Sequence, residues 1–450
     1  MRITAVILAA GQSTRMRSKT PKVLHALAGR PLINYAVETA SLVTGAKPVL
    51  VVGHGAADVR ELLGDRVDYV HQEPQLGTGH AVQQAESVLN GQTDLVLVTL
   101  ADMPLLTERT LEGLVQLQRS GDGPFSMLTV MADDPRGFGR VVRDDSGDVR
   151  EIVEEAHATP EQLAIRELNI SVYCFNADWL WETLPRIPLS PKGEYYLTDL
   201  VGIAGAEGSS VRAMVAEDAS ETIGINTRVH LAEAEAVLRR RINRKWMLAG
   251  VTILDPETTY IEAGVTIGQD AVIWPNTFLS GETSVGDDCI LGPGAIVRDT
   301  RIGNGCRVLN SVLEGAVLED NVDVGPFGHL RKGAHLAQGV HMGNFGEVKN
   351  SYLGPGSKMG HFSYLGDATL GPNVNIGAGT ITCNYDGDKK HPTEIGGGAF
   401  IGSDTMLVAP LKLGENSKTG AGSVVTKDVE PDTMVVGAPA RAIRKLKKRD

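Results

Sequence analysis

The second half of the chain repeats an aliphatic residue at six-residue intervals, often followed directly by glycine. This spacing differs from the period of an α-helix, and glycine supplies the open backbone angles that tight corners need. Within its runs the period is carried by Ile267, Ile273, Leu279, Val285, Leu291, Val297, Ile302, Val308, Val324, Leu330, Leu336, Met342, Val348, Leu353, Met359, Leu365, Ile395, Ile401, Leu407 and Leu413. So many positions in register exclude chance. We predict a parallel β-helix of hexapeptide repeats over residues 252–437, with three short faces in each coil.

The rhythm of this repeat breaks at one place, in the loop of residues 382–394. The segment that leads into it, residues 373–387, reads N-V-N-I-G-A-G-T-I-T-C-N-Y-D-G. Loops held by a rigid scaffold carry function disproportionately often. The broken period therefore marks a candidate site.

The first half of the chain alternates short apolar runs with helical patterns. Strands are predicted at residues 3–9, 49–52, 67–70, 95–99 and 125–130, and helices around residues 32–43, 81–89 and 111–117. This alternation predicts a Rossmann-like α/β domain with a mostly parallel sheet covered on both faces. Ligands of such sheets bind beyond the carboxyl ends of the strands. We predict one domain over residues 1–226, a helical linker over 227–250, and a second domain over 251–450.

Composition narrows the functional classes. A chain of 450 residues is long enough for two or three domains, and its net charge of −12 argues against a general nucleic-acid surface. The basic cluster at residues 441–449 is interpreted as a solvated tail. Four cysteines without a C-x-x-C pair indicate neither zinc nor disulfides and fit a reducing cytoplasm. No apolar run reaches the ~18 residues of a membrane span, so the run at residues 3–10 is predicted to be a buried first strand.

The loop after the first predicted strand is the best candidate site of this half. Residues 8–16 read L-A-A-G-Q-S-T-R-M, and Pro21 and Lys22 follow. Small residues let backbone N–H groups approach phosphate, while Arg15 and Lys22 bring the charge that a departing pyrophosphate requires. The P-loop motif is absent, and a glycine-rich turn alone would also suit an ordinary strand-to-helix turn. In combination, these residues resemble the sugar-nucleotidyltransferase family.

The resemblance extends along the whole chain. The next matching positions are Gln72, residues 75–80 (Q-L-G-T-G-H), Asp102, residues 137–140 (G-F-G-R), Glu154, Asn169, Asn226 and residues 373–387. This order is similar to that of the bifunctional enzymes that make UDP-N-acetylglucosamine, which join an N-acetylglucosamine-1-phosphate uridylyltransferase to a glucosamine-1-phosphate N-acetyltransferase. The resemblance implies a left-handed β-helix and a cytoplasmic homotrimer with acetyl-transfer sites between neighbouring solenoids. It also implies small-molecule substrates, namely glucosamine 1-phosphate, N-acetylglucosamine 1-phosphate, UTP and acetyl-CoA, with no nucleic acid.

For uridylyl transfer, the resemblance implies a Mg²⁺ held by Asp102 and Asn226, with Arg15 and Lys22 as catalytic residues. Hard oxygen ligands suit this ion. Residues implied to bind the nucleotide or UDP-N-acetylglucosamine are Leu8, Ala9, Ala10, Gly11, Lys22, Gln72, Gly77, Thr78, Leu100, Ala101, Asp102, Gly139, Glu154, Asn169 and Asn226. Among these, Gln72, Gly77 and Thr78 would read uracil, and Gly139, Glu154 and Asn169 would take the sugar. Without the resemblance, Asp102 could equally be a turn or helix-cap carboxylate.

For acetyl transfer, His361 is the candidate general base, since imidazole can take the proton of an attacking amine near neutral pH. The resemblance implies that Arg331, Lys349 and Lys390 bind the sugar phosphate, and that Tyr364 and Asn375 bind the sugar. It places acetyl-CoA along Ala378, Asn384, Tyr385, Ser403 and Ala421, with the loop of residues 382–394 as an arm that closes the site. Each lysine could also be a solvated charge. We interpret His329, His335 and His341, at repeat-like spacing, as surface or packing residues.

Some positions depart from the family pattern. Ala156 and His157 stand where a lysine and an aspartate are usual, Ile170 and Ser171 replace a more usual T/S-G, and Ala101 replaces glycine. The metal and phosphate positions are intact. Two alternatives remain open: a sugar-nucleotidyltransferase of other specificity, and a regulatory protein with the same architecture. The presence of Arg15, Lys22 and Asp102 favours an active enzyme.

Overall fold

The computed structural model describes residues 1–12, 14–155 and 158–445, and it divides into two compact units, Met1–Leu238 and Arg239–Asp450. The departures at Ala156 and His157 lie outside the described residues. The division falls within a single helix, α9 (Arg228–Leu248), in the stretch where the sequence predicts a helical linker. Each unit is described by itself.

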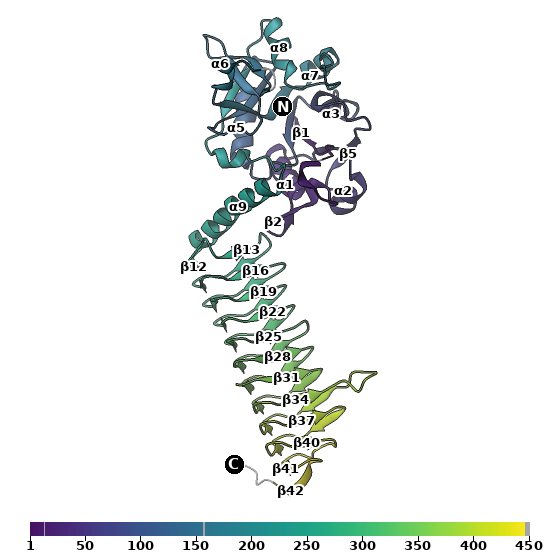
Figure 1. Ribbon diagram of the computed structural model, residues 1–450, viewed down its shortest axis with the longest axis vertical. Coiled ribbons are helices and arrows are strands. Elements are labelled where there is room, and N and C mark those ends of the chain that lie inside the picture. Colours follow the sequence, from purple (N-terminus) through teal and green to yellow (C-terminus); the bar gives the residue numbers. More distant parts are fainter. Residues whose placement is uncertain (13, 156–157, 446–450) are drawn as a thin grey trace. The chain divides into compact units, whose positions relative to one another are not determined.

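The first unit is built on one mixed sheet, whose main path has the strand order β11-β7-β10-β6-β1-β4-β5 (Figure 1). Its strands are β1 (Ile3–Leu8), β4 (Val49–Val52), β5 (Asp68–His71), β6 (Leu95–Leu100), β7 (Phe125–Met131), β8 (Arg140–Arg143), β9 (Val149–Val153), β10 (Glu167–Asn176) and β11 (Arg212–Val215), and β2 (Ala26–Leu27) pairs separately with β3 (Arg30–Pro31). Strands β1, β4, β5 and β6 are parallel, whereas β10 runs antiparallel between β6 and β7. The sheet is therefore mostly parallel, as predicted.

Helices cover both faces of this sheet. They are α1 (Leu32–Thr44), α2 (Ala56–Leu63), α3 (Thr78–Gln83), α4 (Glu86–Leu89), α5 (Glu108–Arg119), α6 (Pro160–Leu163), α7 (Ala177–Thr183) and α8 (Asp199–Ala206), with 3-10 turns η1 (Thr14–Met16), η2 (Lys22–Leu24), η4 (Leu184–Arg186) and η5 (Ala219–Thr222). Alternate residues of β1 enter two different apolar clusters, Ile7 on one face and Val6 on the other. The single helix predicted over residues 81–89 is wrong, because α3 and α4 are separate. Val82, Ala85 and Leu89 are buried across the break, which gives the sequence one continuous helical pattern.

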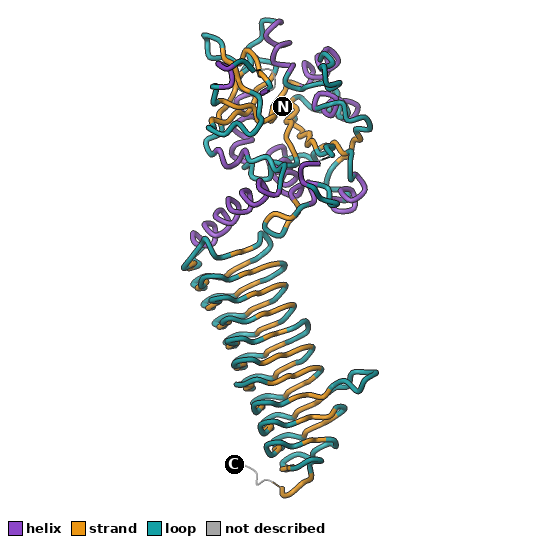
Figure 2. Tube along the Cα trace, viewed as in Figure 1, coloured by secondary structure: helices purple, strands orange, loops and turns teal. Residues whose placement is uncertain are grey.

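The second unit is a solenoid of three parallel sheets (Figures 1 and 2). Face 1 consists of β12 (Thr252–Ile253), β15 (Val272–Ile273), β18 (Ile290–Leu291), β21 (Arg307–Val308), β24 (Asp323–Val324), β27 (His341–Met342), β30 (Lys358–Met359), β33 (Asn375–Ile376), β36 (Phe400–Ile401), β39 (Lys418–Thr419), β41 (Thr433–Val436) and β42 (Arg441–Lys445). Face 2 consists of β13 (Tyr260–Ile261), β16 (Phe278–Ser280), β19 (Ile296–Arg298), β22 (Val312–Glu314), β25 (His329–Leu330), β28 (Gly346–Lys349), β31 (Ser363–Gly366), β34 (Ile381–Cys383), β37 (Met406–Val408) and β40 (Val424–Val425). Face 3 consists of β14 (Thr266–Ile267), β17 (Ser284–Val285), β20 (Arg301–Ile302), β23 (Val317–Leu318), β26 (His335–Leu336), β29 (Tyr352–Leu353), β32 (Ala368–Leu370), β35 (Thr393–Ile395) and β38 (Leu411–Leu413).

One apolar cluster fills this solenoid, and it contains every aliphatic residue of the six-residue period. Leu313 and Leu318, which the counted period skipped, also belong to it. At the first coils, Asn243 of α9 donates from Nδ2 to the carbonyl oxygens of Pro256 and Thr259 at 2.8 and 2.9 Å. At the other end, β42 pairs antiparallel with β41. The β-helix is confirmed, and secondary structure covers both of its ends, as solenoids require.

The basic cluster begins in β42, whose side chains are all exposed. Part of the predicted tail is thus an edge strand, and its remaining residues, 446–449, lie outside the described range. Within the described residues no helix has both the length and the apolar character to cross a membrane.

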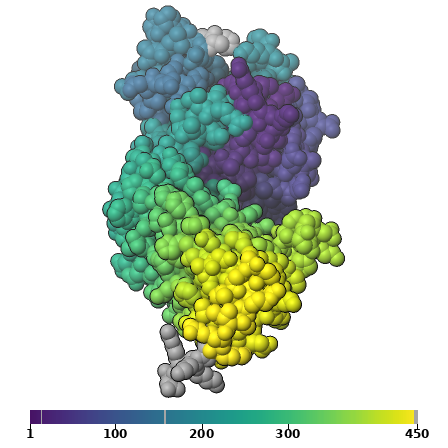
Figure 3. All heavy atoms as spheres, turned by 60° about the horizontal axis from the view of Figure 1, so that its bottom comes forward, coloured from purple at the N-terminus to yellow at the C-terminus, as the bar shows by residue number. Residues whose placement is uncertain are grey.

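The chain leaves the solenoid as an arm over residues 384–392, between β34 and β35 (Figures 1 and 3). The interruption predicted over residues 382–394 is therefore slightly too long at both ends, because residues 382–383 and 393–394 belong to these strands. Thr382 takes the inward position in β34 and is 1% exposed. Its Oγ1 accepts from the backbone N–H of Gly366 at 2.7 Å, which satisfies the hydroxyl in an apolar core. The solenoid thus keeps its register through Cys383, which pairs with Val408, and the arm starts from a fixed base.

Candidate active sites

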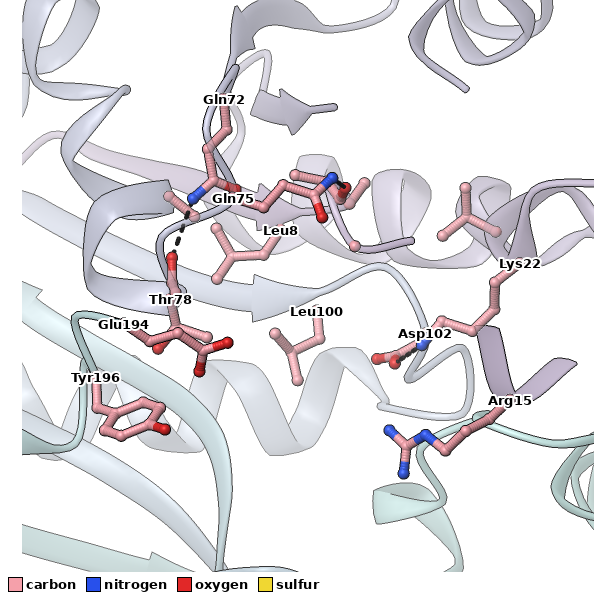
Figure 4. A pocket seen from close by; sticks show the side chains of 16 residues that line it. Leu8, Arg15, Lys22, Gln72, Gln75, Thr78, Leu100, Asp102, Glu194 and Tyr196 are labelled. Atoms are coloured by element: carbon pink, nitrogen blue, oxygen red, sulfur yellow. Dashed lines mark hydrogen bonds and ion pairs between the residues drawn. The ribbon is translucent and has the colours of Figure 1, made fainter. Parts of the chain in front are cut away.

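A cavity of about 500 Å³ opens in the first unit beyond the carboxyl ends of β1 and β6 (Figure 4). Ligands of parallel sheets bind at this edge. The cavity is lined by Leu8, Ala9, Ala10, Gly11, Arg15, Lys22, Val23, Gln72, Gln75, Gly77, Thr78, Ala81, Leu100, Asp102, Glu194 and Tyr196. The structure therefore brings together most of the residues predicted for the nucleotide. The lining does not include the predicted Ala101, Gly139, Glu154, Asn169 and Asn226 among the described residues.

One end of the cavity carries charged side chains (Figure 4). Nζ of Lys22 donates to Oδ2 of Asp102 and, at 3.1 Å, to Oδ1 of Asn226. The Arg15 guanidinium donates to the same Asn226 oxygen at 3.0 Å. The side chains of Lys22 and Asp102 are only 13% and 18% exposed, so water screens their attraction weakly. Asn226 therefore contacts the charged end by hydrogen bonds from Arg15 and Lys22, which both line the cavity.

The opposite end offers a fixed carboxamide and backbone groups (Figure 4). Gln72 is 4% exposed, and its Nε2 donates to the carbonyl oxygen of Gly77 at 3.0 Å. Gly77 has a φ of 94°, and a Cβ there would lie 2.6 Å from the carbonyl oxygen of Tyr195. Only glycine fits this position, immediately before α3. Such a rigid set of donors and acceptors can match the edge of a planar base.

Four residues that line the cavity were predicted neither as site residues nor as part of a matching segment: Val23, Ala81, Glu194 and Tyr196. Val23 and Ala81 are apolar neighbours of predicted positions, whereas Glu194 and Tyr196 come from a distant segment. Tyr195 between them donates its N–H to Leu76 O at 2.8 Å and accepts from Gly79 N at 2.8 Å. This pairing with the segment before α3 carries both neighbours to the cavity. The local sequence contains no signal for a contact over such a distance along the chain.

The three residues predicted for the sugar lie together. Asn169 donates its backbone N–H to the carbonyl oxygen of Gly139 at 2.9 Å. A Cβ on Gly139 would lie 2.7 Å from Cγ2 of Ile152 and 3.6 Å from Oε1 of Glu154, so a side chain would crowd this corner. Ala101 has a different place. It is fully buried and donates its N–H to Leu8 O at 3.1 Å.

In the second unit, His361 is exposed on the corner between faces 1 and 2. Backbone hydrogen bonds of 2.6 to 2.8 Å join this corner to those of the following coils, for example from Asp404 N to Ala378 O. The corners stack because each coil keeps the register of the last. They place His361, Ala378, Ser403 and Ala421 in one column, which we call the His361 column.

Three cations converge where face 2 ends and its corner with face 3 begins, across face 2 from the His361 column. The Lys390 ammonium, brought by the arm, contacts Lys349 and lowers its pKa, and Arg331 nearby acts in the same direction. The guanidinium of Arg331 donates to Oε1 of Glu347 at 2.9 Å, which raises the pKa of Arg331. Like charges held this close repel one another, and a bound anion would remove the repulsion. The cluster is therefore a candidate phosphate site.

Two of the predicted sugar and cofactor residues, Tyr364 and Asn384, lie next to this cluster, at the glycine that pairs with Lys349. A Cβ on Gly366 would lie 2.3 Å from Oη of Tyr364 and 2.7 Å from Nδ2 of Asn384, so these two side chains meet over a bare glycine. Asn384 also donates to Oδ2 of Asp367 at 2.6 Å, which fixes the base of the arm. Asn375 lies in β33 of face 1.

The arm is closed by a network around Asp386. Its Oδ1 accepts from the backbone N–H groups of Asp388 and Lys389 at 2.8 and 2.7 Å, and its Oδ2 lies 2.6 Å from Nε2 of His391. These hydrogen bonds lower the pKa of Asp386, and the bond from the Lys389 backbone has the largest effect. Tyr385 projects from the arm and is 61% exposed.

Three other solenoid histidines each face a carboxylate on the neighbouring coil. The pairs and their separations are His329 with Glu314 at 3.3 Å, His335 with Glu319 at 2.8 Å and His341 with Asp323 at 2.8 Å. These contacts agree with the interpretation of all three histidines as surface residues.

Three curated relatives are similar to this chain over nearly its whole length, and each is named bifunctional protein GlmU. The relative from Heliobacterium modesticaldum is 48% identical, covering 96% of this chain and 95% of its own. The relative from Trichlorobacter lovleyi is 46% identical, over 99% and 98% of the two chains. The relative from Shouchella clausii is 43% identical, over 98% and 97%. The chain belongs to the GlmU family.

Family models match both parts of this GlmU-family chain. A MobA-like NTP transferase domain matches residues 5–158, a bacterial transferase hexapeptide model matches residues 264–299, and a hexapeptide repeat of succinyl-transferase matches residues 392–427. The first match contains the loop after β1 and the charged end at Lys22 and Asp102. The last contains Ser403 and Ala421 of the His361 column.

Proposed function

We propose that the chain synthesises UDP-N-acetylglucosamine at two separate sites. Acetyl-CoA acetylates glucosamine 1-phosphate in the second unit, and UTP then transfers UMP to N-acetylglucosamine 1-phosphate in the first. The two activities follow from membership of the GlmU family, and the assignment of each to particular residues is the proposal. The observation that supports it most is the arrangement of the first cavity, which has the rigid Gln72 amide at one end and the Arg15 and Lys22 cations at the other.

For uridylyl transfer, a nucleotide would lie along the cavity with its base at Gln72 and its phosphates at the charged end. A phosphate oxygen of the sugar attacks the α-phosphorus, a new P–O bond forms, and the bond to the β-phosphate breaks. Pyrophosphate leaves with the bonding electrons. Arg15 and Lys22 stabilise the charge that develops on it, and no protein nucleophile is required.

The residues at the charged end fit a Mg²⁺. The Lys22 ammonium already contacts oxygens of both Asp102 and Asn226, so two hard ligands converge on one positive charge. Within the described residues no group of three or more His, Cys, Asp or Glu could hold a metal, and phosphates and water would complete its coordination. When bound, the ion supplies neutralisation of phosphate charge.

For acetyl transfer, the amine of glucosamine 1-phosphate attacks the thioester carbon. The N–C bond forms, the C–S bond breaks, the amine proton passes to His361, and the thiolate of coenzyme A leaves and is then protonated. Arg331, Lys349 and Lys390 would hold the phosphate and thereby orient the amine. Tyr364 and Asn375 would contact the sugar.

Acetyl-CoA is proposed to follow the His361 column. The backbone groups of Ala378, Ser403 and Ala421 stand on successive coils and are evenly spaced along the column. Such a row suits an extended pantetheine chain. Asn384 and Tyr385 would border it from the arm. The cofactor would then bring its thioester to the end of the column that carries His361.

The proposal includes a cytoplasmic homotrimer. Phe327, Phe345 and Phe362 occupy one corner of successive coils beside His361 and are 55%, 60% and 56% exposed. The rings of Phe327 and Phe345 stack with centroids 5.2 Å apart, and their φ angles of 64° and 57° are costly for bulky residues. An exposed apolar column of this kind supports contact with neighbouring copies.

Phe345→Asp is expected to produce monomers and to lower acetyl transfer by at least about tenfold, because a charge in a packed apolar interface is costly. Uridylyl transfer should stay within about twofold. Sedimentation velocity and the two separate assays measure these effects. Leu42→Asp, at a residue 59% exposed on α1, is the control and should change neither assembly nor activity. A trimeric Phe345→Asp variant would contradict the assignment of this surface.

The proposed function is tested directly by pyrophosphate release from UTP and N-acetylglucosamine 1-phosphate. Turnover should require a divalent cation and should fall sharply with glucose 1-phosphate in place of the acetylated sugar. A chain that prefers another nucleotide or another sugar phosphate would be a nucleotidyltransferase of other specificity. A purified, folded chain without turnover would support the regulatory alternative.

A further inference from the structure

The carboxamide of Asn169 has an unambiguous orientation. The backbone N–H of Ser171 lies 3.1 Å from the atom assigned as Oδ1, and a backbone N–H can only donate, so that atom must be the oxygen. Ser171 reaches this place because its φ of 60° lies in the left-handed region, within an irregular stretch of β10 between Asn169 and Val172. The other terminal atom of the carboxamide is therefore the nitrogen, Nδ2.

That nitrogen meets a second fixed group, the hydroxyl of Tyr173. Nδ2 of Asn169 donates to the tyrosine oxygen at 2.9 Å, and the hydroxyl lies 3.2 Å from Oδ1. Within the described part of the chain, only this oxygen takes a hydrogen from Nδ2. Since an amide nitrogen carries two hydrogens, one remains to donate to a ligand.

Tyr173 is a rigid partner. It is 1% exposed, and its ring packs against Phe125 and Phe175 with centroids 6.1 and 5.4 Å away. Burial raises the pKa of its hydroxyl, which therefore stays protonated and can both donate and accept. A hydroxyl held at the end of a packed ring fixes the direction of any group bonded to it.

We propose that Tyr173 is a positioning residue of the uridylyl site, which turns the Asn169 amide so that its second N–H donates to the acetylated sugar. The inference rests on the proposed function, in which Asn169, Glu154 and Gly139 surround that sugar. Tyr173 touches no substrate and acts only through Asn169. Without the hydroxyl, the one partner that the carboxamide keeps among the described residues is the Ser171 N–H, which holds the oxygen but lets the amide turn about χ2, so the oriented donor is lost.

Tyr173→Phe tests the inference, since it removes the hydroxyl and keeps the ring. The KM for N-acetylglucosamine 1-phosphate should rise by roughly tenfold, the effect of one oriented hydrogen bond. The KM for UTP and the acetyl-transfer rate should stay within about twofold. KM does not depend on the amount of active enzyme, so partial unfolding of the variant cannot imitate this result. Tyr69→Phe is the matched control, because its hydroxyl donates to Gly64 O at 2.8 Å elsewhere in the same unit.

A double-mutant cycle separates positioning from general packing. If Tyr173 acts through Asn169, the Asn169→Ala and Tyr173→Phe pair should match Asn169→Ala alone in KM. Additive effects, or an unchanged KM in Tyr173→Phe, would overturn the inference. Wild-type enzyme without uridylyl transfer would refute the proposed function instead, so the two failures are distinguishable.

Discussion

Asp102→Asn is expected to lower kcat/KM for uridylyl transfer by on the order of 1,000-fold, about 4 kcal/mol of transition-state stabilisation. The substitution keeps the shape of the side chain and removes its charge. That charge pairs with Lys22 and is proposed to hold the divalent cation with Asn226, in a site only partly open to water. Initial rates of pyrophosphate release measure the loss, and acetyl transfer on the same preparation should remain within about twofold.

The control for this prediction is Asp68→Asn. Asp68 belongs to the same unit and pairs with Lys47 at 2.7 Å, but both side chains are roughly half exposed, so the pair contributes little. Its uridylyl rate should match that of the wild type. A parallel loss of acetyl transfer in Asp102→Asn would contradict two independent sites. A uridylyl rate near wild type would remove Asp102 from the mechanism.

The solenoid could be predicted from sequence because its contacts are periodic. Each inward aliphatic residue packs on those of adjacent coils, so the pattern that builds the fold is the pattern printed in the chain. The same register accounts for the His361 column. The arm lengthens one coil between Ala378 and Ser403, yet both residues return to the same corner.

The first unit was predictable in class but not in detail. Alternating strands and helices give the mostly parallel sheet, whereas the insertion of β10 between β6 and β7 depends on pairing between distant segments. Glu194 and Tyr196 reach the cavity for the same reason, through the backbone pairing of Tyr195. Sequence motifs identify site residues that lie within one short segment. They do not predict residues that reach the site through contacts between distant segments.

The charged end shows what a motif adds to such a cavity. Arg15 and Lys22 could be placed in one loop from sequence, and Asp102 in another. Their meeting with Asn226 at a single point required the fold. The residue types needed for phosphate chemistry can be recognised in the sequence. Their convergence follows from the fold, which places both loops at the same edge of the sheet.

His361→Ala is expected to lower acetyl transfer by about 100- to 10,000-fold and to leave uridylyl transfer within about twofold. An amine becomes a product amide only after losing a proton, and His361 stands at the end of the column proposed for the thioester. Arg331, Lys349 and Lys390 would still bind the sugar phosphate, so the loss should appear in kcat more than in the KM for glucosamine 1-phosphate. Thiol release from acetyl-CoA measures the rate.

His341→Ala is the matched control for this prediction. His341 is also a partly exposed solenoid histidine, but it faces Asp323 at 2.8 Å on face 1, outside the His361 column. Its removal should leave acetyl transfer within about twofold. If both variants lost activity equally, the effect would come from the solenoid and not from a base at His361. If neither did, the amine would lose its proton to another group, and the column would be a binding surface alone.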